Sequence, residues 1–203
     1  MADSAGVKQL LHVGCGTKTI DNLPAFFQSG WRETRLDINP DVAPDIVASL
    51  TDLSAVESGG YDAVWSSHNV EHVFHHEATE VCRAFRRVLR GGGFAVITCP
   101  DLRTAMEIGA KKGLDATIYD SPIGPITPRD MLFGHQRSIA RGNTYMAHRN
   151  GFDLTSLRDV LVAAGFQRTF GVRVQYDLWF IAGDFAGTDA ARTQLGEILE
   201  RTV

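Results

Sequence analysis

The sequence predicts an α/β protein built on a doubly wound, seven-stranded sheet that is mostly parallel and ends in an antiparallel edge hairpin. Short apolar segments alternate with segments of helical period, the pattern of a parallel sheet with helices on both faces. The apolar run at 10–13 stops at glycines, as a buried strand does where it enters a tight turn. Apolar segments at 167–174 and 177–183 are two residues apart, so we expect them to pair as a hairpin.

The other elements follow in chain order. Strands are expected at 34–38, 45–48, 61–65 and 94–99, and a short helix at 19–28 is complicated by Pro24. The clearest helix has an apolar stripe at 3.6-residue spacing and ends at three glycines; its members are Phe74, Ala78, Val81, Cys82, Phe85, Val88, Leu89 and the stop Gly91-Gly92-Gly93. A later helix at 153–164 has Asp153 as its cap and Gly165 as its stop, and a polar helix closes the chain.

The composition indicates a single globular domain. A chain of 203 residues with 44% hydrophobic and 22% charged residues can bury a sizeable core. A formal charge of -4 argues against a protein built mainly to bind nucleic acid. The three cysteines are odd in number and widely spaced, which favours reduced thiols, and the first residues lack a signal-peptide pattern. No stretch approaches the ~20 apolar residues of a membrane span. We therefore expect a cytoplasmic protein.

Residues 101–152 differ from the rest and predict an insertion within the single domain 1–203. Three prolines and frequent glycines break regular structure there, so we expect a helix near 103–112 followed by long loops. Long loops in compact domains tend to be lids or binding loops. The segment 130–152 is rich in histidine and arginine, which favours a substrate lid and hints at an anionic acceptor. A contact between two copies of the chain, in a homodimer, is the alternative.

The first strand leads into Gly14-Cys15-Gly16, where glycines let the backbone approach a ligand closely. Asp37 follows about 20 residues later, at the end of the second strand, where a carboxylate can accept both ribose hydroxyls of a nucleoside. The alternative for the glycines is a tight turn that only ends the strand and binds no ligand. The alternative for Asp37 is a solvent-exposed turn residue. The spacing favours a nucleoside site.

These motifs, in this order, resemble class I S-adenosylmethionine-dependent methyltransferases, in particular the small bacterial type-11 group. The matching segments are LLHVGCGTK, TRLDINP, DIVASLTDL, YDAVWSSHNVEHV, FRRVLRGGGFAVITCPD and DLTSLRDVLVAAGF. The resemblance implies a Rossmann-like fold, S-adenosylmethionine as cofactor and S-adenosylhomocysteine as product. It also implies a set of cofactor-binding residues: Gly14, Cys15 and Gly16 at the methionine and ribose, Asp37 at the ribose hydroxyls, Ile38 on the adenine, Ser49, Leu50 and Thr51 at the adenine edge, and Ser67 and His68 beside the methionine.

Two residues depart from the pattern of this family. An acidic residue often stands where this chain has His12, and a third glycine where it has Lys18. The acidic residue commonly helps to position the methionine end of the cofactor. The departures at His12 and Lys18 motivate a second hypothesis, a cofactor-binding scaffold of the same fold without turnover.

The segment His68-Asn69-Val70-Glu71-His72 spells H-x-x-E-H, the signature of inverted zinc proteases. We reject a protease, because the string follows a strand directly whereas those enzymes carry it on a helix. The Glu-His pair matches the strand exit of the type-11 group. RNA 3′-end 2′-O-methyltransferases have a related Glu-x-x-Glu-His pattern that holds a divalent ion. By that resemblance His68, Glu71 and His72 would be the ligands here, with His135 or His148 as a further ligand. Clustered histidines are more often solvated or hydrogen-bonded, so we expect no metal.

Methyl transfer needs an aligned nucleophile, exclusion of water and, for some acceptors, a base. The candidate catalytic residues are His68, His72, His135 and Tyr145, with His148 as a further imidazole. A structural hydrogen bond is the alternative for each. The function predicted is methyl transfer to a small-molecule acceptor, and an RNA acceptor is disfavoured by the acidic charge.

Overall fold

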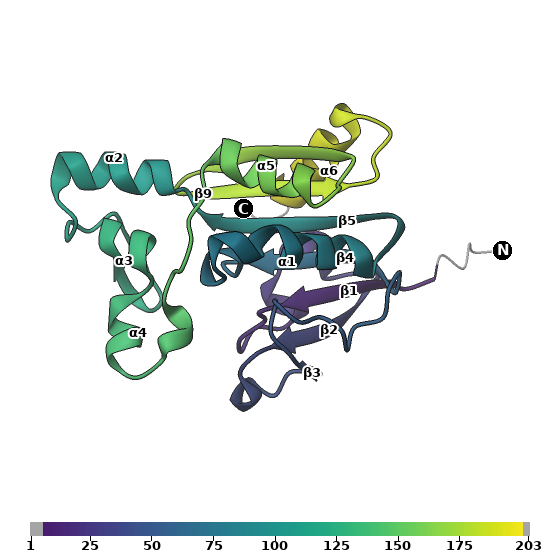
Figure 1. Cartoon of the computed structure of the whole chain (residues 1–203), viewed down its shortest axis with the longest axis horizontal. Helices are drawn as coiled ribbons and strands as arrows, with labels where there is room; N and C mark the ends of the chain where they lie inside the picture. Colours follow the sequence, from purple (N-terminus) through teal and green to yellow (C-terminus); the bar gives the residue numbers. More distant parts are fainter. Residues whose placement is uncertain (1–5, 201–203) are drawn as a thin grey trace.

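The computed structural model describes residues 6–200 and has a seven-stranded sheet at its centre (Figure 1). Its strands are β1 (Lys8–Val13), β2 (Trp31–Asp37), β3 (Ile46–Val47), β4 (Tyr61–Ser67), β5 (Leu89–Pro100), β8 (Arg168–Val174) and β9 (Asp177–Gly183). Their order across the sheet is β3-β2-β1-β4-β5-β9-β8. Only β9 runs antiparallel to its neighbours, so the predicted fold class and the carboxyl-terminal hairpin are confirmed.

Helices cover both faces of the sheet. On one face, α1 (His75–Val88) and α5 (Leu154–Ala163) bury Phe85 and Leu161 against β1, β4 and β5. On the other face, α6 (Thr188–Glu200) and the 3-10 turn Ala25–Phe27 bury Leu195 and Phe27. The strands contribute alternate residues to the two cores, as the two-residue period of a strand requires.

The order of the strands determines where a ligand can bind. The chain passes from β1 outward through β2 to β3 and then returns to β4 on the other side of β1. The strand order therefore reverses between β1 and β4, and the loops that leave their carboxyl ends diverge. A crevice at such a reversal is where open α/β sheets bind their ligands.

Several elements differ from the sequence-based expectations. The helix expected at 19–28 is two 3-10 turns, Ile20–Asn22 and Ala25–Phe27, because Pro24 between them lacks an amide hydrogen. The three glycines expected to stop α1 lie within β5, which begins at Leu89. Of these glycines only Gly92 has a positive φ, of 79°. Gly91 and Gly93 can therefore adopt the backbone conformation of a strand.

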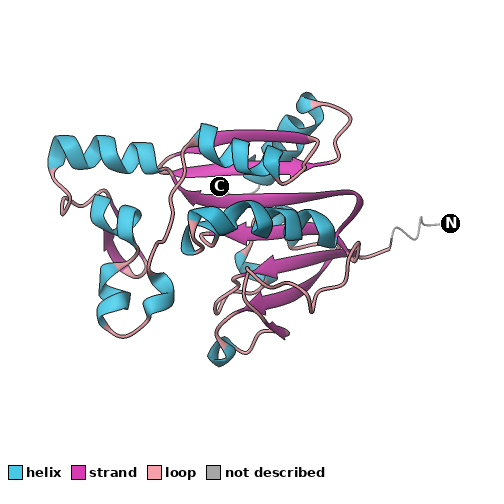
Figure 2. Cartoon of the chain, viewed as in Figure 1, coloured by secondary structure: helices cyan, strands magenta, loops and turns pink. Residues whose placement is uncertain are grey.

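The insertion is more regular than predicted (Figure 2). It contains α2 (Leu102–Lys112), the hairpin strands β6 (Tyr119–Ser121) and β7 (Gly124–Ile126), α3 (Pro128–Phe133), α4 (Gln136–Ala140) and the 3-10 turn Thr144–Met146. A small apolar cluster of Ala105, Ile126 and Met131 holds it together. The expectation of long loops overlooked the start of α3, where Thr127 is the cap and Pro128 occupies the first turn.

Within residues 6–200, none of the helices combines the length and the apolar character that a membrane crossing requires. Residues 1–5, part of the segment used in the targeting prediction, lie outside the described residues.

Candidate cofactor-binding and active site

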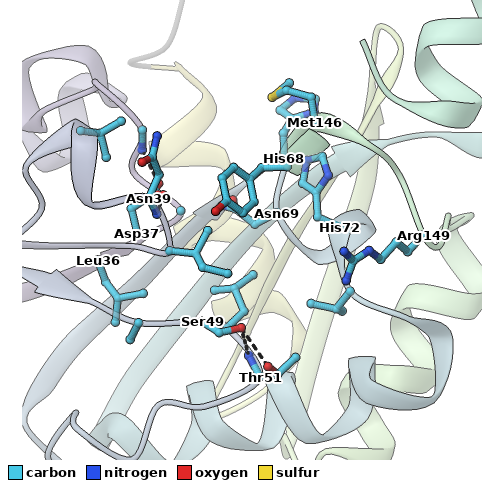
Figure 3. A pocket seen from close by; sticks show the side chains of 18 of the residues that line it. Leu36, Asp37, Asn39, Ser49, Thr51, His68, Asn69, His72, Met146 and Arg149 are labelled. Carbon is cyan, nitrogen blue, oxygen red and sulfur yellow. Dashed lines mark hydrogen bonds between the residues drawn. The ribbon is translucent and has the colours of Figure 1, made fainter. Parts of the chain in front are cut away.

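A pocket of about 350 Å³ lies at the carboxyl ends of β1, β2 and β4, where the strand order reverses. Figure 3 shows Asp37 and Asn39 on one side of it and His68 and His72 on the other. Ser49 and Thr51 lie below these residues in this view, and their hydroxyls are 2.8 Å apart. The insertion supplies part of the wall through the segment 143–146 and Arg149.

The turn after β1 requires glycine at Gly14. Its φ of 58° is in the left-handed region, and a Cβ there would lie 1.7 Å from Oδ1 of Asn69. The Asn69 side chain is fixed in this position because its Nδ2 donates hydrogen bonds to the carbonyls of Val13 (2.8 Å) and Ser67 (3.2 Å). Asn69 therefore ties the end of β1 to the end of β4.

Gly16 serves a different purpose. Its φ is 54°, but a Cβ at this position would meet no protein atom within 4 Å, and Gly16 lines the pocket. A side chain there would take space from a ligand. The turn thus forms a cradle for close approach of a ligand to the backbone, which is what a nucleoside cofactor requires.

Asp37 is held at the end of β2 by two backbone groups. Its Oδ2 accepts a hydrogen bond from the N–H of Gly16 at 2.7 Å, and its Oδ1 accepts one from the N–H of Asn39 at 2.9 Å. The residue is 9% exposed, yet it lines the pocket. Each oxygen retains a second lone-pair site, so the carboxylate can also accept hydroxyl groups of a ligand.

Arg35 joins the two loops beside Asp37. Its guanidinium donates to the carbonyls of Gly16 (2.7 Å) and Lys18 (3.0 Å) in the first loop. It also donates to the carbonyls of Val42 (3.2 Å) and Ala43 (2.9 Å) in the loop after β2. These bonds fix the spacing of the two loops that form one end of the pocket.

The side chain of His68 lies between two carboxylates. Its Nδ1 is 3.4 Å from Oε1 of Glu71, and its Nε2 is 3.6 Å from Oδ2 of Asp177. Although desolvation opposes it, the two carboxylates raise the pKa of His68 well above its usual value. His68 has a φ of 54°, an uncommon conformation for a residue with a Cβ, which points to a constraint at this position. A protonated imidazole at this position would supply a positive charge to the pocket rather than act as a base.

Glu71, His72 and His148 form a second cluster at the edge of the pocket. One potential ligand atom of each lies within 4.8 Å of those of the other two. Glu71 is 1% exposed, and within the described residues its two carboxylate oxygens have no hydrogen-bond partner. The carbonyl of Glu71 accepts hydrogen bonds from the N–H groups of Arg149 (2.9 Å) and Asn150 (3.1 Å), which hold the insertion against the H-x-x-E-H segment.

That segment does not have the geometry of an inverted zinc protease. Val70–His72 is a 3-10 turn, and α1 begins only at His75, so His68 and His72 do not share a helix.

The structure brings most of the predicted site residues to the pocket. The predicted residues that line it are Gly14, Gly16, Asp37, Ile38, Ser49, Leu50, Thr51, His68, His72 and Tyr145. Three others do not line it: Cys15 is buried, the Ser67 hydroxyl accepts a hydrogen bond from Thr98, and His135 is buried with its Nδ1 2.7 Å from the Ser138 hydroxyl. His135, one of the candidate catalytic residues, therefore lies outside the pocket wall in this structure.

Sequence reasoning missed Asn69, Asn143 and Met146, which also line the pocket. Asn69 could have been predicted, because a polar residue just after the fourth strand lies opposite the glycine turn that follows the first strand. Asn143 and Met146 belong to the insertion, and no local sequence pattern predicts how the insertion folds over the pocket.

His12, the residue that departs from the acidic pattern, does not line the pocket. It is 2% exposed, and its Nδ1 is 2.6 Å from Oε1 of Glu33. The other oxygen of Glu33 accepts the N–H of Ile20 at 2.8 Å. Burial lowers the pKa of His12, which favours the neutral ring, and Nδ1 is the donor because a carboxylate only accepts. The substitution at this position removes no group from the pocket wall.

Residues 11–97 match a family model described as a methyltransferase domain, of the type-11 group. No curated protein matches the chain. Among solved structures, a 1,6-didemethyltoxoflavin-N1-methyltransferase from Burkholderia thailandensis, with bound 1,6-didemethyltoxoflavin and S-adenosylhomocysteine, is similar at a TM-score of 0.54 and 14% identity over 86% of this chain and 70% of that one.

Two further structures have the same fold. A SAM-dependent methyltransferase from Archaeoglobus fulgidus has a TM-score of 0.56 and 15% identity, over 87% of this chain and 86% of the other. An S-adenosylmethionine-dependent methyltransferase from Mesorhizobium loti has a TM-score of 0.55 and 13% identity, over 88% of this chain and 92% of the other. At these identities the similarity establishes the fold.

Proposed function

We propose that this chain is a class I S-adenosylmethionine-dependent methyltransferase that transfers a methyl group from this cofactor to a small-molecule acceptor, a function supported by its match to a methyltransferase-domain model and by its fold. The observation that carries the proposal is the pairing of a glycine cradle with a strand-end carboxylate. Gly16 lines the pocket and its N–H donates to Asp37, which also lines the pocket and retains free lone pairs. This arrangement fits the ribose of a nucleoside cofactor.

Other residues complete the proposed cofactor site. Ile38 is 47% exposed at the pocket, an unusual position for an apolar side chain that packing against adenine would explain. Ser49, Leu50 and Thr51 would flank the base, and His68 and Asn69 would lie at the methionine end. When bound, the cofactor supplies an electrophilic methyl carbon, and the protein has to align the acceptor and exclude water.

The insertion would act as the lid over the acceptor. Tyr145 and Met146 line the same pocket as Asp37, so the insertion would cover both the cofactor and the acceptor. A pocket of about 350 Å³ closed in this way suits a small molecule better than a polynucleotide, in keeping with the formal charge of -4. The side chain of Phe133 is 55% exposed, which is the feature that supports the alternative, a contact between two copies of the chain.

Arg149 is the residue best placed to recognise an acidic group on the acceptor. It lines the pocket, and its guanidinium lies 5.0 Å from the centre of the Phe74 ring. Arg137, another arginine of the segment 130–152, lies against Gly124 instead. A cation held on an aromatic face beside the acceptor space would pair with a carboxylate.

Neither His12 nor Lys18, the two departures that motivate the scaffold hypothesis, lines the pocket, which favours an enzyme over a scaffold. A cytoplasmic location is proposed on the three cysteines, which are all free and buried. Two measurements test the function. Calorimetry with S-adenosylhomocysteine tests the site, and incubation with labelled S-adenosylmethionine and metabolite extracts tests turnover. Binding without turnover would favour the scaffold.

A further inference from the structure

We propose that Glu71, His72 and His148 bind one divalent transition-metal ion, of the kind represented by Zn²⁺, at the edge of the cofactor pocket. The proposal reverses the expectation from the sequence, and the reason is tertiary. His148 is 77 residues from Glu71 in the chain, and only the folded insertion brings the two together.

Glu71 provides the first argument. The residue is 1% exposed, and neither carboxylate oxygen has a hydrogen-bond partner among residues 6–200. A buried carboxylate without partners is costly, and buried charges are ordinarily paired or bound to a metal. Its nearest cation, His68 Nδ1, is 3.4 Å away from Oε1, and the side chain of His68 is 43% exposed and shared with Asp177. Oε2 thus remains for another cation.

The two histidines provide the second argument, which is independent of the first. Nδ1 of His72 lies 3.1 Å from the carbonyl oxygen of Ala147, and Nδ1 of His148 lies 3.0 Å from that of Met131. A carbonyl only accepts, so each Nδ1 carries the hydrogen, and in the neutral ring Nε2 is the nitrogen with the free lone pair. Hydrogen bonding of Nδ1–H to a backbone carbonyl is how metal-binding histidines are oriented.

The donor set indicates the class of ion. Two imidazole nitrogens and one carboxylate suit zinc or iron, whereas magnesium and calcium prefer sites made of oxygen. Three protein ligands leave positions open for water or another molecule, as in catalytic zinc sites. The ligand atoms lie within 4.8 Å of one another, so a small inward movement of side chains would close them around an ion at ~2.0–2.2 Å.

An ion here would join two parts of the molecule. Glu71 and His72 belong to the turn after β4, and His148 belongs to the insertion. His72 also lines the cofactor pocket, so the ion would lie beside the proposed acceptor space. Binding of the ion can be measured without any methyl transfer, so the experiment measures binding alone.

The test uses the full chain, stripped with a chelator, dialysed and titrated with Zn²⁺ by calorimetry, and with Co²⁺ by visible spectroscopy. We expect one ion per chain, with Co²⁺ giving the absorption bands of a four- or five-coordinate site. His148→Gln and Glu71→Gln should each weaken Zn²⁺ binding at least about 100-fold. His75→Gln is the matched control, because His75 is an exposed histidine of the same segment, and it should bind as the wild type does.

Binding of S-adenosylhomocysteine to each variant shows that the pocket has folded. Glu71→Gln also separates a metal site from a plain ion pair with His68. In a metal site, this change removes the increase in melting temperature that Zn²⁺ gives the wild type, while the metal-free protein is no less stable. The proposal is overturned if the wild type binds no Zn²⁺ at micromolar concentrations, or if His148→Gln binds it as tightly as the wild type.

Discussion

The side chain of Asn69 occupies the space where any residue other than glycine at position 14 would place its Cβ, only 1.7 Å from the Asn69 Oδ1. The turn that approaches the cofactor space is therefore shaped from β4 as well as from β1. Gly14 and Gly16 both have a positive φ, but only Gly14 faces a neighbouring side chain.

Gly14→Ala should therefore be much more damaging than Gly16→Ala. Both changes place an alanine in the left-handed region, which costs ~1–2 kcal/mol. In Gly14→Ala, Asn69 must also move and lose its bonds to Val13 and Ser67, worth ~0.5–1.5 kcal/mol each. Denaturant unfolding of the two variants compares the costs. Equal losses of stability would show that the contact with Asn69 is unimportant.

Asp37→Asn should weaken binding of S-adenosylhomocysteine at least about tenfold, because hydrogen bonds to a charged group contribute ~1.5–3 kcal/mol each. The asparagine keeps an oxygen that can accept from the N–H of Gly16 or Asn39, so the loop should remain folded. Asp41→Asn, in the exposed part of the next turn, is the control. Calorimetry that finds the same affinity in both variants would remove Asp37 from the cofactor site.

Arg35→Met should lower both stability and cofactor affinity, since four carbonyls of two loops lose their donor. We expect a loss of at least about 1 kcal/mol in unfolding free energy. Arg32→Met changes an exposed arginine of the same strand and should change neither quantity. If Arg35→Met behaves like Arg32→Met in unfolding and in calorimetry, the two loops keep their spacing without the guanidinium.

Replacing Tyr145 should lower catalytic activity, whereas replacing His135 should lower stability. Tyr145 lines the pocket and is 55% exposed, so Tyr145→Phe should lower kcat/KM about tenfold or more without changing the melting temperature. His135 is buried away from the pocket and bonded to Ser138, so His135→Gln should lower the melting temperature and leave turnover of the folded protein within about threefold. The opposite pattern would restore His135 as the catalytic candidate.

The parts of this protein that sequence could predict are those set by local patterns. The run 10–13 with its glycines predicted β1 and its turn, and Asp37 was placed at the end of β2 because a carboxylate there follows a strand signal. The hairpin of β8 and β9 followed from two apolar runs with a short gap. Each inference needed only a few adjacent residues.

Contacts between distant segments could not be predicted in this way. The pairing of Asn69 with Val13 spans 56 residues, and His148 reaches Glu71 only because the insertion folds back. Arg35 looked like an ordinary strand residue, since nothing local shows that four carbonyls surround it. Hydrogen bonds from a side chain to a remote backbone leave no periodic signal in sequence.

The central claim is that this pocket holds S-adenosylmethionine for methyl transfer to a small molecule. The most direct test incubates wild type and Asp37→Asn with methyl-labelled S-adenosylmethionine and a fractionated metabolite extract, and follows S-adenosylhomocysteine and labelled low-mass products together. We expect equal amounts of both products with the wild type, and at least about tenfold less of both with Asp37→Asn at a cofactor concentration below the dissociation constant. If the wild type binds the cofactor but forms no S-adenosylhomocysteine above the rate of Asp37→Asn in any fraction, the claim of catalysis is contradicted.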